Sequence, residues 1–389
     1  MLGKWKQRWK KTVVCVFSAI LMIGTAGMPV AAADQLNLYA QSYCVMEANT
    51  GRILMEKNGD KSRANASTTK ILTCLYVIEH CDLNATVKVS KLAASQPKVH
   101  LQMRKGEEYK VKDLLYALML ESYNDCAYAL AEYACGSVEK FEEAVNQEAV
   151  KIGASNTHFV TPNGLDKKDS KGWHRTTAKD LALIMRRCIK NKTFLQITRT
   201  KKYTFKNVAG TRLFECYNHN VLLTTMKGAI SGKTGYTDRA GYCYIGAVEK
   251  DGITYIVALL RSGVPSNWDF KWRDMSKIIT YAGKTYERKQ VAAQDELKAV
   301  SVSKGVTDTV DTYVKENKVQ LICKKKEQVQ VKYDYKKNLV APVKKNQKVG
   351  TVSYYIGNEC VKKQDVFTSA KVEEKTLLWQ IKHFMSSIF

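Results

Sequence analysis

Hydrophobic and polar positions alternate clearly in the first part of the chain and then change to longer apolar runs. Ser42–Glu47 and Arg52–Glu56 alternate on either side of a turn at Ala48–Gly51, which predicts two paired strands. The runs that follow have helical length or spacing and predict five helices. These are Ile71–His80, Val111–Leu120, Cys126–Cys135, Val138–Gly153 and Thr177–Ile189, the last with Thr177 as its cap.

The pattern returns to strands after Ile230. Tyr242–Glu249 and Ile253–Leu260 are apolar and rich in β-branched residues, and a short turn separates them, so they predict two central strands. Met275–Tyr286 predicts a closing helix. Strands therefore lie at both ends of this region with helices between them, which indicates an α+β fold.

A different composition, rich in Lys and Val, begins near Val291. Alternation in Val319–Cys323, Val329–Tyr335 and Val349–Tyr355 predicts a small antiparallel β domain. The tail that follows predicts an amphipathic helix. Its apolar residues at helical spacing are Leu377, Leu378, Ile381, Phe384, Met385 and Ile388.

The N-terminus has the order of a secretory signal peptide. Five basic residues precede an apolar run from Val13 to Val30, and Ala31–Ala33 offers a small-residue cleavage site before Asp34. The alternative is a membrane-spanning anchor, since the run approaches spanning length. Glycines and a proline break the run just before the cleavage site, so we favour a signal peptide over residues 1–33.

The chain is strongly basic, with a formal net charge of +25 in 389 residues. Removal of residues 1–33, which hold five basic and no acidic residues, leaves +20. Such a charge favours anionic surfaces. No nucleic-acid-binding motif accompanies it. An anionic membrane or wall polymer is therefore the expected partner, and nucleic acid is not.

Ten cysteines follow the signal segment, and several lie in apolar stretches, including Cys74, Cys126, Cys188 and Cys243. An exported protein can form disulfides, but C-x-x-C spacing is absent from the sequence. We expect buried free thiols. No zinc-binding pattern is present, and the six histidines are dispersed, so we expect neither a metal nor a cofactor.

Three short strings carry candidate chemistry: Ser67-Thr68-Thr69-Lys70, Ser122-Tyr123-Asn124 and Lys233-Thr234-Gly235. S-x-x-K also occurs at Ser95, Ser137 and Ser301, but only the string at Ser67 precedes both others and a long apolar helix. Each string alone has a structural explanation: a helix cap, a turn and a hairpin entry. Their order and local context make the set informative.

The first string places a nucleophile beside a base. A serine hydroxyl needs a base to take its proton, and residues three apart on a helix face the same way. Lys70 can be that base only if its pKa falls, which burial and a second cation such as Lys233 both favour. Strand alternation leaves open whether Lys233 and Thr234 both reach the site, while Gly235 permits close approach of a substrate backbone.

Together the strings resemble the serine-type D-alanyl-D-alanine carboxypeptidases, the low-molecular-mass penicillin-binding proteins of peptidase family S11. The resemblance extends over most of the mature chain. It implies a β-lactamase/transpeptidase-like catalytic domain over 34–288, a C-terminal β domain over 291–372 and a membrane-surface helix over 374–389. The matching stretches are Ala66–Thr73, Glu121–Ala131, Thr161–Asp166, Thr176–Leu183, Gly228–Gly241 and Leu339–Val352.

The resemblance also implies a role for each site residue. Ser67 attacks the penultimate D-alanine of a peptidoglycan stem peptide, Lys70 accepts its proton, and Ser122 protonates the leaving D-alanine. Asn124 binds Lys70 and the substrate amide, Lys233 and Thr234 hold the terminal carboxylate beside Gly235, and the amides of Ser67 and Tyr236 form the oxyanion hole. β-Lactams acylate the same serine.

Two departures from the family pattern remain open. Tyr123 stands where the family commonly has Gly, and Lys271 or Arg273 stands near a position where the family often has a carboxylate-binding Arg. A β-lactamase is the first alternative, but no deacylating Glu pattern matches. A catalytically weak penicillin-binding or wall-binding module is the second. The expected location is the outer face of the cell membrane or the cell wall, with peripheral attachment.

Overall fold

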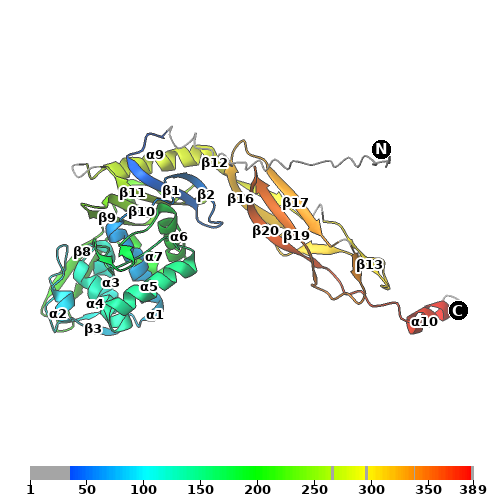
Figure 1. The fold of residues 1–389 in the computed structure, drawn as a ribbon, viewed down its shortest axis with the longest axis horizontal. Coiled ribbons are helices and arrows are strands. Elements are labelled where there is room, and N and C mark those ends of the chain that lie inside the picture. Colours follow the sequence, from blue (N-terminus) through cyan, green and yellow to red (C-terminus); the bar gives the residue numbers. More distant parts are fainter. Residues whose placement is uncertain (1–35, 264–266, 294–296, 337, 387–389) are drawn as a thin grey trace, which may run out of the picture.

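The computed structural model describes residues 36–386 except 264–266, 294–296 and 337, so the expected signal peptide lies outside the described residues. Figure 1 shows a larger mixed domain, an elongated β domain and a terminal helix in succession. Three hydrophobic cores underlie this arrangement, two on the faces of one sheet and one in the β domain. The α+β class and the C-terminal β domain are confirmed.

A five-stranded antiparallel sheet organises the larger domain, with the order β2-β1-β11-β10-β9. The two predicted N-terminal strands and the two predicted central strands are all present. β9 lies at the sheet edge and carries Lys233, Thr234 and Gly235. The strands are β1 (Ala40–Glu47), β2 (Ile53–Lys57), β9 (Ala229–Thr237), β10 (Gly241–Lys250) and β11 (Ile253–Ser262).

The inner face of the sheet packs on a helical region through the larger core, in which Cys44, Met46, Ile245 and Ala258 meet residues of the helices. The five predicted helices are present, and two short helices and α7 were not predicted. The helices are α1 (Lys70–His80), α2 (Lys91–Ala94), α3 (Val111–Leu120), α4 (Asn124–Cys135), α5 (Val138–Ile152), α6 (Ala178–Cys188), α7 (Lys192–Arg199) and α8 (Leu222–Thr225).

The larger domain also contains three short two-stranded sheets among its described residues. Two of them lie against the helical region, and the third, β5–β6, is a small hairpin that follows the turn at Thr161–Gly164. They are β3 (Thr86–Lys88) with β4 (Glu108–Lys110), β5 (Lys168–Asp169) with β6 (Gly172–Trp173), and β7 (Lys202–Lys206) with β8 (Leu213–Tyr217).

A single long helix, α9 (Phe270–Thr285), covers the outer face (Figure 1). It begins five residues before the predicted start, because the charged residues of its first turn hide its apolar spacing. Asp274 is fully buried there and accepts hydrogen bonds from the backbone amides of Tyr39 (2.9 Å) and Ala40 (2.8 Å) and from the hydroxyl of Ser262 (2.7 Å). One carboxylate thus joins the first strand, the end of β11 and α9.

The C-terminal domain begins as β12 (Tyr286–Ala292) leaves α9 and pairs with β16 (Lys318–Lys324). The three strands on which the prediction of an antiparallel domain rested pair in that direction, but β13 and β18, which were not predicted, pair in parallel. The remaining strands form a three-stranded and a four-stranded sheet. They are β13 (Val300–Ser303), β14 (Thr309–Val310), β15 (Thr312–Val314), β17 (Val329–Tyr335), β18 (Asn338–Val340), β19 (Lys348–Ile356) and β20 (Glu359–Thr368).

The last helix, α10 (Leu377–Ser386), lies at the end of the β domain far from the larger domain (Figure 1). Its apolar side chains are largely exposed: Leu377 by 75 %, Leu378 by 80 %, Ile381 by 52 % and Met385 by 58 %. Among the described residues, no helix is both long enough and apolar enough to cross a membrane.

All ten cysteines of the described chain are free thiols, as expected from the sequence. Six of those in the larger domain are fully buried among apolar side chains, where they act as small apolar residues. Cys360, on β20, is the only exposed one among the described cysteines.

We predict that Asp274→Ala lowers the free energy of unfolding by about 3 kcal/mol, because a partly buried amide, a buried amide and a buried hydroxyl lose their acceptor. Urea denaturation measures this. The neighbouring variant Arg273→Ala, which removes an exposed pair with Asp269 and a contact with the Phe270 ring, is the control and changes the stability by less than about 1 kcal/mol. Equal effects of the two substitutions would contradict the structural role of Asp274.

Candidate active site

The first motif begins on a 3-10 turn, Ala66–Thr69, that leads directly into α1. The side-chain amide of Asn65 holds this turn by donating to the hydroxyls of Thr68 (3.0 Å) and Thr69 (2.9 Å). The sequence predicts Ser67 at the start of the α-helix; the tighter turn found instead aligns residues i and i+3 more closely. Ser67 therefore faces Lys70 from the turn that precedes α1.

Lys70 lies at the centre of the site and is fully buried. Its ammonium nitrogen Nζ lies 2.8 Å from Ser67 Oγ, 2.9 Å from Asn124 Oδ1 and 2.9 Å from the carbonyl oxygen of Asn163. Burial and then the charge of Lys233 hold its pKa well below that of an ordinary lysine. A neutral Lys70 amine at this position can accept the proton of Ser67.

The second motif spans the end of the break between α3 and α4, with Ser122 and Tyr123 in the break and Asn124 as the first residue of α4. Ser122 has a positive φ of 68°, and its hydroxyl makes no hydrogen bond within the described structure. Asn124 begins α4 and is buried, and its side-chain nitrogen donates to the carbonyls of Pro97 and Lys98, both at 3.2 Å. These two bonds orient the Asn124 oxygen towards Lys70.

The third motif lies on the edge strand β9. Lys233 is 2 % exposed, and its Nζ donates to the carbonyl of Thr234 at 3.0 Å. Burial lowers the pKa of Lys233 to about 7, against the opposing charge of Glu121. Lys233 lies two residues before Gly235, which approaches the Ser67 amide, so the site holds two buried amines, and the charge of Lys233 contributes to the lowered pKa of Lys70.

Gly235 sets the distance between β9 and the turn that carries Ser67. A Cβ atom at this position would lie 2.9 Å from the Ser67 amide nitrogen and 3.0 Å from the Asn65 carbonyl oxygen. A side chain there would push the strand away from the turn. The residues on either side of Gly235 are more exposed: Thr234 is half-buried, and Tyr236 is 39 % exposed.

The sequence did not identify Asn163, whose carbonyl is a direct partner of Lys70. It lies in the turn at Thr161–Gly164, whose T-P-N-G sequence is typical of a turn. Gly164 has a φ of +87°, and a Cβ there would lie only 2.0 Å from the Ala66 carbonyl oxygen. The T-P-N-G sequence indicates a turn, but it does not show that the turn packs against Ala66 and bonds Lys70.

His174 connects the turn that carries Ser67 with the segment that precedes the Thr161–Gly164 turn. Its Nε2 lies 2.8 Å from the Thr69 hydroxyl, and its Nδ1 accepts from the Val160 amide at 3.0 Å. Burial, followed by the charges of His158 and Lys70, lowers the pKa of His174 to about 3. His174 is therefore a neutral structural residue at physiological pH.

Lys271 and Arg273 lie on α9. Lys271 donates to the carbonyl of Trp268, and its Nζ lies 4.9 Å from the ring centroid of Tyr242 and 4.7 Å from that of Trp272. Arg273 pairs with Asp269 at 2.8 Å. Lys271 therefore packs among aromatic rings next to β10, and Arg273 forms an ion pair within its own helix.

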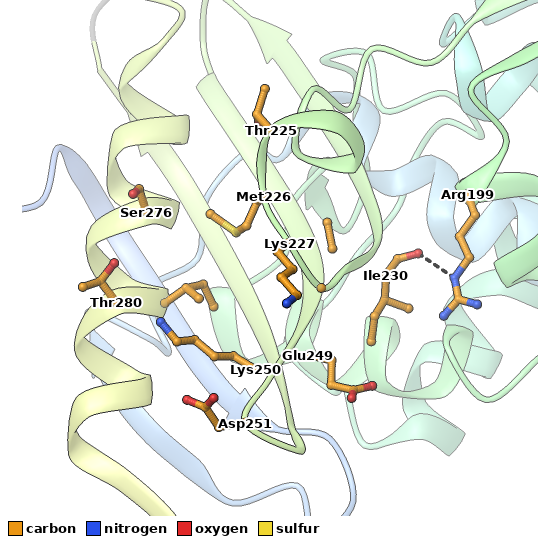
Figure 2. Close-up of a pocket in the computed structure, with 13 residues that line it drawn as sticks. Arg199, Thr225, Met226, Lys227, Ile230, Glu249, Lys250, Asp251, Ser276 and Thr280 are labelled. Carbon is orange, nitrogen blue, oxygen red and sulfur yellow. Dashed lines mark hydrogen bonds between the residues drawn. The ribbon is translucent and has the colours of Figure 1, made fainter.

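A cavity of about 830 Å³ lies at the opposite end of β9, where the strand begins (Figure 2). Figure 2 shows Lys227, Lys250 and Asp251 at its edge, and Arg199 donating to the carbonyl of Ile230 at 3.1 Å. None of the predicted site residues lines this cavity. Among the described residues, no cluster of three or more His, Cys, Asp or Glu side chains could hold a metal ion.

Comparisons with known proteins agree with this geometry. A family profile described as D-alanyl-D-alanine carboxypeptidase matches residues 29–262, and one described as penicillin-binding protein 5, C-terminal domain, matches residues 286–374. The chain is 34 % identical to a D-alanyl-D-alanine carboxypeptidase of Streptomyces sp. K15, over 69 % of this chain and 96 % of that protein.

Two further relatives cover more of the chain. D-alanyl-D-alanine carboxypeptidase DacA of Escherichia coli K12 is 27 % identical over 96 % of this chain and 98 % of its own length. The crystal structure of penicillin-binding protein 5 from Haemophilus influenzae superposes with a TM-score of 0.72 at 24 % identity, over 87 % of this chain and 98 % of that one. The second likeness concerns the fold alone.

The pKa of Lys233 makes the stability of the fold depend on pH. Between about 7 and the ordinary value of 10.5 the unfolded chain binds more protons than the folded one, so the free energy of unfolding rises with pH in that window. We predict that Lys233→Met reduces this rise, by at most about 1.4 kcal/mol per pH unit. Urea denaturation at pH 7, 8 and 9 measures it.

The control is Lys284→Met, which removes an exposed lysine of α9 and leaves the pH slope unchanged. A Lys233→Met protein with the slope of the unmodified chain would show that Lys233 is not held in a pKa-lowering environment.

Proposed function

The chain belongs to the peptidase S11 family of D-alanyl-D-alanine carboxypeptidases, and from this premise we propose that it removes the terminal D-alanine from peptidoglycan stem pentapeptides through an acyl-enzyme on Ser67. One observation carries the proposal: Ser67 Oγ lies 2.8 Å from the buried amine of Lys70. A hydroxyl and a lysine of lowered pKa at this distance form an activated nucleophile.

The first step forms a bond from Ser67 Oγ to the carbonyl carbon of the penultimate D-alanine, while Lys70 Nζ takes the hydroxyl proton. The side-chain oxygen of Asn124 keeps Lys70 oriented, and its side-chain nitrogen donates to the carbonyl of Pro97. The amides of Ser67 and Tyr236 stabilise the oxyanion. The proximity of Gly235 to the Ser67 amide supports this pairing of the two backbone segments.

The tetrahedral intermediate collapses as the bond to the terminal D-alanine breaks. The leaving amine takes a proton through Ser122, whose hydroxyl makes no hydrogen bond among the described residues and can turn towards it. Lys233 and Thr234 hold the terminal carboxylate, which explains the need for a free C-terminus. Water then attacks the ester, releases the shortened peptide and restores the Ser67 hydroxyl. β-Lactams form the same ester and hydrolyse slowly.

We predict that Ser67→Ala lowers release of D-alanine from a pentapeptide ending in D-Ala-D-Ala by at least about 10³-fold, and that it abolishes labelling by a fluorescent penicillin. Released D-alanine and gel fluorescence are the two measurements. The matched control is Ser301→Ala, since Ser301 also begins an S-x-x-K string but lies exposed on β13. It should behave like the unmodified protein.

The outcomes separate the alternatives. Labelling without D-alanine release by the unmodified protein would indicate a weak penicillin-binding module, and rapid turnover of penicillin would indicate a β-lactamase. Unchanged release by Ser67→Ala would assign the nucleophile to another residue.

The protein acts outside the membrane, attached peripherally by its tail. The net charge of +20 that remains without residues 1–33 favours an anionic surface. The exposed apolar residues of α10 face solvent at the far end of the β domain, where they are free to enter a lipid interface. The same helix has no long apolar stretch that would span a bilayer.

We predict that the chain starting at Asp34 sediments with anionic phospholipid vesicles and that deletion of Lys375–Phe389 reduces the bound fraction at least about tenfold, because the apolar face of the tail enters the lipid interface. The double substitution of Leu378 and Ile381 by Ser is the matched variant, because it keeps the tail and its charge. Penicillin labelling in both variants reports an intact catalytic domain. Full vesicle binding without the tail would locate the membrane contact elsewhere.

A further inference from the structure

Three arginines gather beyond the end of β9 that follows the K-T-G motif, and we call Arg63, Arg239 and Arg261 the arginine rim. Arg239 is exposed in the turn between β9 and β10, and Arg261 is exposed at the end of β11 with a φ of +56°. Arg261 Nη1 donates to the carbonyl of Arg239 at 2.8 Å. A Cβ at Gly241 would lie 3.1 Å from Arg261 Cγ, so the side chain lies across this glycine.

The rim lies beside the reaction centre. Cys243 is paired with Gly235 in the sheet, and Gly235 approaches the Ser67 amide. Burial raises the pKa of Cys243 to about 11; the backbone of Arg261 and the charges of Arg63 and Arg261 act against this rise, and the charge of Asp166 adds to it. Cys243 Sγ lies 4.0 Å from the carbonyl oxygen of Ala64 and 3.7 Å from that of Ala240, the residues that follow Arg63 and Arg239.

The rim arginines have no carboxylate partner among the described residues. Arg63 Nε donates to the Ser42 hydroxyl at 2.7 Å, Arg261 donates to a backbone carbonyl, and Arg239 packs on an aromatic ring. Burial, and then the charge of Arg261, lowers the pKa of Arg63. Guanidinium groups bind carboxylates through paired hydrogen bonds, so this cluster is suited to an anionic ligand.

A tryptophan from another segment fixes the position of Arg239. Trp173 ends the β5–β6 hairpin and is 41 % exposed, and the guanidinium carbon of Arg239 lies 3.9 Å from its ring centroid. Arg175 Nη1 in turn donates to the carbonyl of Trp173 at 3.1 Å. The hairpin therefore places the Trp173 ring against Arg239. This contact restricts the side-chain conformations of Arg239 before a ligand binds, so binding costs less conformational entropy.

The direction of β9 indicates which part of a stem peptide reaches the rim. An extended substrate can add to this edge strand in antiparallel direction. With its terminal carboxylate at Lys233 and Thr234, the residues that precede the scissile bond extend past Thr237 towards Arg239. Those residues carry two possible carboxylates: the side-chain group of a diaminopimelate at position three, and the α-carboxyl of the γ-linked D-glutamate at position two.

Resting on the proposed function, we propose that the arginine rim binds a carboxylate on the acyl side of the stem peptide and so selects substrates in which that group is free. Amidation of the carboxyl group, or lysine in place of diaminopimelate, removes the anion that the rim receives.

The test compares four pentapeptides that end in D-Ala-D-Ala. They carry diaminopimelate at position three and D-glutamate at position two, with neither, either or both of these carboxyl groups amidated. We expect amidation of the responsible group to lower kcat/KM for D-alanine release about tenfold, as the loss of one charge-assisted contact implies. The single-amide peptides identify which carboxylate the rim binds.

Substitutions in the arginine rim are the second part of the test. Arg239→Gln and Arg261→Gln should lower kcat/KM for the free acid to that for its amide, so that the ratio between them falls to about one. Trp173→Ala should weaken the discrimination, and Trp173→Phe should preserve it by keeping a ring under Arg239. The control Arg187→Gln removes the same charge from α6, where Arg187 pairs with Glu79 at 2.8 Å, and should leave the ratio unchanged.

The two levels of the proposal fail separately. If none of the four peptides loses D-alanine, the proposed function is wrong. If all four are processed at equal rates, or if Arg261→Gln and Arg239→Gln keep the ratio of the unmodified protein, the arginine rim is not a carboxylate subsite.

Discussion

Two lysine amines buried close together are the constraint on which the site depends. An unpaired buried charge is expensive, so burial and the neighbouring cation together lower the pKa of Lys70, and burial lowers that of Lys233. The fold compensates with polar partners for Lys70: the Ser67 hydroxyl, the Asn124 amide and the Asn163 carbonyl. Each partner comes from a different segment, so the chemistry of one amine depends on the packing of the whole domain.

The sheet and the helical region are brought together by backbone contacts that tolerate no side chain. Gly235 lets β9 lie against the turn at Ser67, and Gly164 lets the Thr161–Gly164 turn pass under the same turn. On the outer face, Asp274 joins the first strand, β11 and α9. The sheet is thus held on both faces, and β9 lies at its edge with β10 as its one neighbouring strand in the sheet.

The sequence predicted the parts whose signal is local or strongly periodic. The strands around Ala48–Gly51, the helices at Val111–Leu120 and Thr177–Ile189, and the contact of Ser67 with Lys70 all follow from spacing or capping. The family and fold followed from three short strings in order. The role of Asn163 could not be predicted, because a backbone carbonyl has the same chemistry in every residue. The parallel pairing of β13 with β18 could not be predicted from the sequence either, since the alternation of apolar and polar residues does not specify strand direction.

The distribution of thiols has a practical consequence. Since the cysteines of the catalytic core are buried or partly covered and only Cys360 is open to solvent among the described ones, a maleimide dye should attach to a chain that starts at Asp34 at a single place on the β domain. That position lies away from Ser67, on the strand that follows β19. A fluorophore there, combined with a second one carried by a penicillin, would report the separation between the reaction centre and the outer domain by energy transfer, without any engineered cysteine.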